Sequence, residues 1–147
     1  MTATLQSQAQ QSIAENVYHH ALALIEALKD NYRQYAIRGH QRSLQRLEGN
    51  TDTGIAYHQR CIDDLKNGIC PIDYVIESGK KYHKIVMIDS GSSRSVHAFV
   101  DKKTGEVYKS ASWKSPAKGV RYDLRLIADR EWLLENADWS GGYLYAK

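Results

Sequence analysis

The stretch of residues 111–122, ASWKSPAKGVRY, has the residue types and spacing that can do the most chemistry in this chain. It alternates aromatic rings with cations. Cations neutralise phosphate charge and release counterions, and an aromatic ring can stack on an unpaired base with roughly 1–3 kcal/mol of gain. The stretch is therefore a candidate surface for a phosphate-bearing ligand. The alternative is that Trp113 anchors the loop in the core while its lysines are only solvated.

The distribution of charge supports the first interpretation more than the total does. A net charge of +3 is too small to indicate nucleic acid by itself. Ten basic and three acidic residues fall between Lys80 and Arg121, which gives that segment +7 and leaves −4 for the remainder. We expect the ligand-binding residues to come from this segment, namely Arg94, Lys109, Trp113, Lys114, Lys118, Arg121 and Tyr122.

Metal chemistry has little support in the sequence. His58 and Cys61 form one half of a zinc motif, but no second pair of ligands follows at a matching spacing. Two cysteines cannot build the disulfide framework of a small secreted domain, so Cys61 and Cys70 are interpreted as small core residues with free thiols. We expect no metal and no cofactor.

Catalytic motifs are also missing from the sequence. The serines that follow Asp89 are typical of a turn, and no G-x-S-x-G elbow, P-loop or G-x-G-x-x-G motif occurs. His97 is interpreted as a structural, hydrogen-bonded histidine within a strand. We therefore expect a protein that is not an enzyme.

The first half of the chain predicts helices. Residues 1–11 are polar and are expected to form a flexible lead-in, while Ser12 and Glu15 have the spacing of a capping box that begins a helix. This helix is predicted to run to about Arg38, where Gly39 weakens it, and two shorter helical pieces complete a helical region over residues 12–69.

The first helix carries an apolar face that is too wide for one neighbour. Val17, Leu24 and Leu28 lie on one stripe, and a second stripe runs beside it. Such a face requires either a helical hairpin within the chain or a second copy of the chain. The stripe is accordingly predicted to be a homo-oligomer interface, with an internal core as the alternative.

The second half predicts a basic antiparallel sheet and a closing helix over residues 70–147. Strands are expected at about 81–88, at 94–101 and from Glu106 onward, with Gly105 at a positive φ in the turn between the last two. Residues 70–79 fit a helical turn or an extended segment, and residues 124–137 predict the last helix. The fold class is α+β, with N-terminal helices, a three-stranded antiparallel sheet and a C-terminal helix in one compact domain.

No run of about eighteen apolar residues occurs, and the N-terminus lacks the basic start and apolar core of a signal peptide. We expect a cytoplasmic protein with no membrane partner.

The residues RSVHAFVDKKTGEVYKSASWKSPAKGVRYDL, with DWSGGYLY near the end, resemble a block in small uncharacterised proteins encoded by tailed bacteriophages. The resemblance covers the C-terminal half and leaves the helices of residues 12–69 outside it. It implies a phage or prophage setting, in the cytoplasm of the host cell, and carries no activity with it.

Together these observations predict a non-catalytic, phage-type accessory protein that binds nucleic acid or another phosphate-bearing ligand through a basic, aromatic face. Two alternatives stay open. The chain can be a protein-interaction module that inhibits or masks a host factor, or it can sequester a nucleotide defence signal in a small pocket.

Overall fold

The structure is a computed structural model that describes residues 5–47 and 54–145. Its elements are, in chain order, α1 (Leu5–Arg46), α2 (Gly54–Lys66), β1 (Ile72–Ser78), β2 (Tyr82–Asp89), β3 (Ser93–Asp101), β4 (Glu106–Lys109), β5 (Tyr122–Asp123), α3 (Ile127–Asn136) and the 3-10 turn η1 (Gly142–Leu144). The expected α+β class is confirmed. Among the described residues, no helix is long and apolar enough to cross a membrane.

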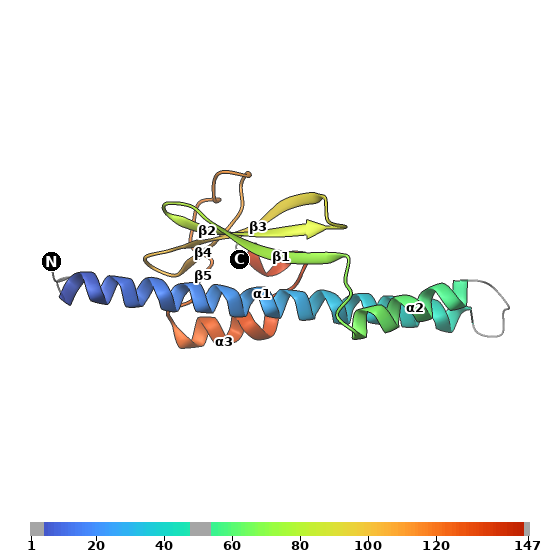
Figure 1. The fold of residues 1–147 in the computed structure, drawn as a ribbon. Coiled ribbons are helices and arrows are strands. Elements are labelled where there is room, and N and C mark those ends of the chain that lie inside the picture. Colours follow the sequence, from blue (N-terminus) through green and yellow to red (C-terminus); the bar gives the residue numbers. More distant parts are fainter. Residues whose placement is uncertain (1–4, 48–53, 146–147) are drawn as a thin grey trace.

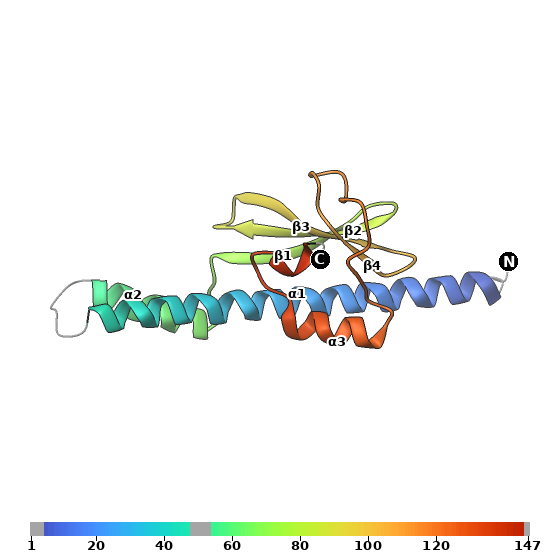
Figure 2. The ribbon, with the colours of Figure 1, turned by 180° about the vertical axis from the view of Figure 1, so that it is seen from behind.

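The helix α1 is the element against which the sheet, α2 and α3 all pack. Its 42 residues extend about 60 Å, at 1.5 Å per residue. The sheet lies along one side of α1, α3 lies along the opposite side, and α2 folds back beside its C-terminal end (Figures 1 and 2). A second, smaller core joins Ile37 of α1 to Ile62 and Leu65 of α2.

Two predictions about α1 are wrong. The described part of the predicted flexible lead-in, residues 5–11, is helical, since its Leu, Gln and Ala residues favour a helix that continues past Ser12. The helix also continues through Gly39 as far as Arg46. A glycine inside a helix costs about 1 kcal/mol, and the packing of α2 against this part of α1 outweighs that cost.

The sheet has five strands in the described part of the chain, where the sequence predicted three. They are antiparallel neighbours in the order β1-β2-β3-β4-β5. The segment that the sequence left undecided, residues 70–79, supplies β1, and β5 is only two residues long. A β-bulge shifts the β2–β3 register between Ile85 and Val86.

The core forms where the inner face of the sheet meets α1. Val17, Leu24 and Leu28 have no exposed surface and pack with Ile85, Val100 and other strand residues in one cluster. The stripe predicted to be an oligomer interface is therefore internal core, and this prediction is corrected. Its wide face is covered within one chain, because the sheet and α3 pack against α1 from two sides.

The β3–β4 turn depends on Asp101 and Gly105. One carboxylate oxygen of Asp101 accepts from the backbone N–H groups of Lys103 and Thr104, at 2.8 and 3.1 Å. Gly105 has φ 78°, which confirms the predicted positive φ. A Cβ at Gly105 would lie 2.9 Å from Cγ of Arg125 and 3.4 Å from Cγ2 of Val17, so the turn is pressed against α1.

The internal position of Leu24 predicts a large cost for its truncation. We expect Leu24→Ala to lower the free energy of unfolding by about 2–5 kcal/mol, because it leaves a cavity in the core. The matched control is Leu22→Ala, two residues along the same helix, where the side chain is 37% exposed. Urea unfolding measures both. Equal effects of the two substitutions would contradict this description of the core.

Gly105 and Gly91 provide a second matched pair, because both have φ 78° and only Gly105 has close neighbours. Both Gly→Ala substitutions pay about 1–2 kcal/mol for a left-handed conformation. We expect Gly105→Ala to cost at least about 1 kcal/mol more than Gly91→Ala, because the new methyl group must displace the Arg125 side chain. Thermal unfolding of the wild type and both variants measures the two costs. A larger loss of stability in Gly91→Ala than in Gly105→Ala would contradict the assigned packing.

Candidate nucleic-acid interface

The face of the sheet that points away from α1 carries a row of paired polar and aromatic side chains. Directly opposite residues on neighbouring strands share a face of the sheet. The register pairs Glu77 with Lys84, Lys84 with Phe99, and Phe99 with Tyr108, so these four residues cross the outer face from β1 to β4. Tyr82 lies two residues before Lys84 and is on the same face, since successive side chains alternate.

Aromatic rings gather on this face. The ring of Tyr82 lies 5.6 Å from the ring of Phe99 and 6.1 Å from that of Tyr108, each in an edge-to-face arrangement. Phe99 is buried beneath its neighbours, with 2% exposure, while Tyr82 and Tyr108 are half-buried. The rings therefore form a firm platform that is partly open to solvent.

The loop after β4 brings Trp113 onto the platform. This loop stands above the sheet on the side away from α1 (Figure 1). Its base is closed by a bridge between Ser110 and Pro116 and by the Ala117 N–H donating to the Lys109 carbonyl at 2.7 Å. The Lys84 ammonium lies 4.4 Å from the centre of the Trp113 ring and 5.9 Å from that of Phe99. Trp113 is 42% exposed, so the alternative that it anchors the loop in the core is wrong.

Lysines of the β1–β2 turn surround a hollow beside the platform. The hollow has a volume of about 320 Å³ and is lined by Lys80, Lys81, Tyr82 and Lys84, together with Glu77, Ser78, Gly79 and Phe99. The Lys81 ammonium lies 5.3 Å above the Tyr82 ring, and a hydrogen bond with Tyr82 raises the pKa of Lys81. We call Lys80, Lys81, Tyr82, Lys84 and Trp113 the outer-face site.

The outer-face site includes only one of the seven residues selected from the sequence, Trp113. Arg94 forms an ion pair with Glu77 across the sheet. Lys114 and Lys118 are exposed on the same loop as Trp113. Lys109 lines a different pocket, beside the C-terminal turn.

Arg121 and Tyr122 have donors that the chain itself uses. The Arg121 guanidinium donates to the carbonyls of Leu144, Lys118 and Gly119 at 2.7–3.0 Å. The Tyr122 hydroxyl donates to the Tyr143 carbonyl at 2.7 Å. The Tyr122 ring also stacks on Trp132, with 5.0 Å between ring centres. Both residues fix the loop and the C-terminal turn in place.

Sequence reasoning missed Lys80 and Lys81 of the β1–β2 turn and Tyr82 and Lys84 of β2. All four lie in the segment KKYHK, whose alternation places Tyr82 and Lys84 on one face and His83 on the other. The alternation was visible in the sequence. Which face of the sheet Tyr82 and Lys84 occupy depends on the pairing of β2 with β1, and the sequence left β1 undecided.

Three histidines, His40, His58 and His97, make hydrogen bonds within the protein. Nδ1 of His40 and Nδ1 of His58 lie 2.9 Å apart, which joins α1 to α2. No group of three or more His, Cys, Asp or Glu residues within 5–47 and 54–145 is arranged to hold a metal ion. His97 is hydrogen-bonded through Nε2 to the Tyr143 hydroxyl at 2.8 Å, as its interpretation as a structural histidine requires.

The fold and the outer-face site define an α+β protein whose sheet is covered on one face and carries cations and aromatic rings on the other. Its sequence matches the family model described as "Family of unknown function (DUF7717)" over residues 3–146. The chain belongs to this family. The match includes the N-terminal helices, so these are part of the family's common sequence together with the sheet. No curated protein and no solved structure matches the chain.

His97 makes the stability of the protein sensitive to acid. Burial lowers its pKa to about 4, and the nearby Asp138 carboxylate opposes that shift. The rings of Tyr74 and Tyr143 pack against the imidazole. Because the unfolded chain takes up this proton near pH 6.5 and the folded chain resists it, the stabilisation is complete above about pH 6.5 and is lost as the pH falls toward 4.

We expect this loss to reach about 3 kcal/mol across that pH range. His97→Gln should remove this component, so its unfolding free energy should fall less than that of the wild type between pH 7 and pH 4. His19→Gln, at an exposed position, is the control and should keep the wild-type dependence. Urea titrations at several pH values measure all three proteins. Parallel curves for the wild type and His97→Gln would refute the assignment.

Proposed function

We propose that this protein binds nucleic acid, or another ligand that carries phosphate groups, through the outer-face site and without catalysis. The observation that carries the proposal is the position of the Lys84 ammonium between Phe99 and Trp113, beside a hollow lined by Lys80 and Lys81. The setting that we propose is that of a phage or prophage accessory protein acting in the cytoplasm, in line with the resemblance of the C-terminal half.

The site offers the two interactions that a single strand requires. Lys80 and Lys81 are exposed and can neutralise phosphates in the hollow, with Lys84 at its edge. Tyr82 lines the same hollow, and the exposed ring of Trp113 lies against Lys84 at its edge, so unpaired bases can stack on both rings. Bases of a duplex are not available for stacking, so these residues favour single strands over duplexes.

The carboxylate that could compete with a ligand for the lysines of the hollow already has a partner. Glu77 lines the hollow and is the one acidic residue among the residues that line it, and it pairs with Arg94. The hollow therefore keeps the charge of its lysines available for a ligand. Arg94 contributes by neutralising Glu77, in place of the direct ligand contact predicted from the sequence.

A protein partner is the second candidate function. Leu126, Ile127 and Leu134 are 55%, 63% and 37% exposed on and beside α3. This surface lies on the side of α1 opposite the sheet (Figure 2). A host factor that is masked by this protein would find apolar contacts there. A nucleotide sponge has less support, because Arg121, one of the predicted ligand-binding residues, donates to backbone carbonyls of the chain.

The binding proposal predicts a specific salt dependence. The triple substitution Lys80→Gln, Lys81→Gln and Lys84→Gln should flatten the slope of log K against log salt by about two units for a single strand, at about 0.7 per phosphate contact. The matched control is Arg42→Gln, Arg46→Gln and Lys66→Gln, which removes the same charge from the helical hairpin of α1 and α2. Fluorescence anisotropy with a labelled oligothymidylate measures the slope.

Trp113→Ala should weaken binding of the single strand by about tenfold and change binding of a duplex less, because only the single strand loses a stacking contact. Equal flattening of the salt slope by both triple variants would show that binding is a general charge effect. Absence of binding to single- and double-stranded DNA and RNA at low salt would exclude the proposed function.

A further inference from the structure

The outer-face site ends at the β1–β2 turn, and a second concave surface begins there. This groove has a volume of about 430 Å³ and lies between the N-terminal part of α1 and two neighbouring turns. Lys80 lines both the hollow of the outer-face site and the groove, so the two surfaces are adjacent. The other residues that line the groove are Gln10, Gln11, Ile13, Ala14, Lys102 and Lys103.

Hydrogen bonds hold the β1–β2 turn and the β3–β4 turn beside each other. The Lys102 backbone N–H donates to the Lys81 carbonyl at 3.0 Å, and the Lys102 ammonium donates to the Gly79 carbonyl at 2.9 Å. The Asp101 carboxylate fixes the second turn by accepting from the Lys103 N–H at 2.8 Å. The two turns therefore keep a fixed arrangement at this end of the sheet.

The protein does not neutralise the charge of the groove. Among the described residues, no carboxylate lines the groove, and none forms an ion pair with Lys80, Lys102 or Lys103. Lys80 and Lys103 are exposed. The wall formed by α1 adds the half-buried apolar side chains of Ile13 and Ala14. The groove thus offers cations for phosphates and apolar surface for the rings of a nucleic-acid strand.

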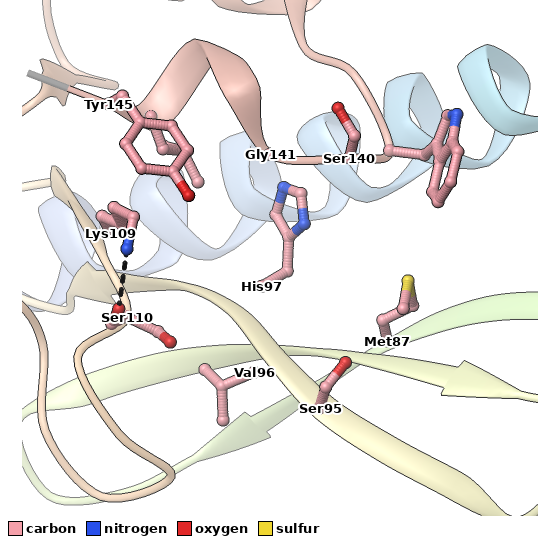
Figure 3. Close-up of a pocket in the computed structure, with 11 residues that line it drawn as sticks. Met87, Ser95, Val96, His97, Lys109, Ser110, Ser140, Gly141 and Tyr145 are labelled. Carbon is pink, nitrogen blue, oxygen red and sulfur yellow. Dashed lines mark hydrogen bonds between the residues drawn. The ribbon is translucent and has the colours of Figure 1, made fainter.

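The pocket beside the C-terminal turn offers less to a chain of phosphates. Figure 3 shows its lysine, Lys109, directed at the Ser110 carbonyl, which lies 3.5 Å from the ammonium. The same ammonium lies 4.8 Å from the centre of the Tyr145 ring. His97 lies apart from Lys109 in this pocket, and its lowered pKa keeps it neutral at physiological pH. The pocket therefore has one cation where the groove has three.

We propose that a single strand bound at the outer-face site continues past Lys80 into the groove. This inference rests on the proposed function. In the groove, the phosphates contact Lys102 and Lys103, and the sugars or bases pack on the α1 wall. The hollow lies on the face of the sheet away from α1, whereas α1 itself forms one wall of the groove, so the path bends round the β1–β2 turn. A duplex is stiff over about 150 base pairs and cannot follow this bend, so the complete path selects single strands.

Two labelled oligothymidylates, of about five and about fifteen nucleotides, separate the two parts of the path, since comparable sites span about 4–16 nucleotides. We expect the short strand to occupy the outer-face site, where the aromatic rings lie. Lys102→Gln with Lys103→Gln should flatten the slope of log K against log salt by about 1.4 for the long strand only, at about 0.7 per lost phosphate contact. The control, Arg42→Gln with Arg46→Gln, removes two charges from the last turns of α1 and should change neither slope. Fluorescence anisotropy with the full chain measures both strands.

The α1 wall provides a second test that leaves every lysine in place. Gln10→Glu puts a negative charge into the groove. Gln8→Glu adds the same charge two residues away, at an exposed position on the nearly opposite side of the helix. We expect Gln10→Glu to weaken binding of the long strand by about threefold, because the new carboxylate repels phosphate, and Gln8→Glu to weaken it less. Binding of the short strand should be the same in both variants.

Equal salt slopes for the long and short strands, or equal effects of the groove variants and their controls, would overturn this inference while leaving binding at the outer-face site intact. Polyglutamate of the same length that displaces the long strand as readily as unlabelled oligothymidylate would also overturn it, because the groove would then be a surface for acidic proteins. If neither strand binds the wild type at low salt, the proposed function fails and the inference fails with it.

Discussion

The burial of the α1 stripe beneath the sheet is the constraint on which the rest of the structure depends. Val17, Leu24 and Leu28 lose all contact with solvent when the inner face of the sheet packs on them. Burial of three such side chains contributes roughly 1.5–3 kcal/mol each, so the sheet cannot turn its other face to the helix without a large loss. The packing therefore decides that Lys84 and Tyr82 face solvent while His83 faces α1, where it lies beside Tyr18.

Local signals predicted β2, β3, β4 and the β3–β4 turn, because alternation and a glycine at positive φ act within a few residues, but they did not predict β1 and β5. The hydrogen-bond partners of Arg121 and Tyr122 were not predictable from such local signals. Their partners, Leu144 and Tyr143, lie more than twenty residues further along the chain. The sequence does not distinguish an arginine that donates to backbone carbonyls from one that binds phosphate. The continuity of α1 through Gly39 was missed for a related reason, since it is secured by contacts with α2.

The two faces of the sheet carry different sets of side chains around their pockets. Its outer face has exposed lysines and aromatic rings around an open hollow, which suits an extended, charged ligand. Its inner face, beyond the part covered by α1, closes around His97 and Lys109 in a smaller pocket. Lys109 and Ser110 line that pocket and lie at the base of the loop that carries Trp113. The same loop therefore joins the pocket to the outer-face site. The family match over residues 3–146 covers all of these elements.

The most direct test of the central claim is to map a single-stranded oligonucleotide onto the protein by backbone amide chemical shifts. We predict that, for a short strand, the shifts which change concentrate in residues 80–84 and 112–114, on the face of the sheet that points away from α1. Shifts concentrated on the exposed surface of α3, or spread evenly over the exposed lysines and arginines of α1 and α2, would contradict it.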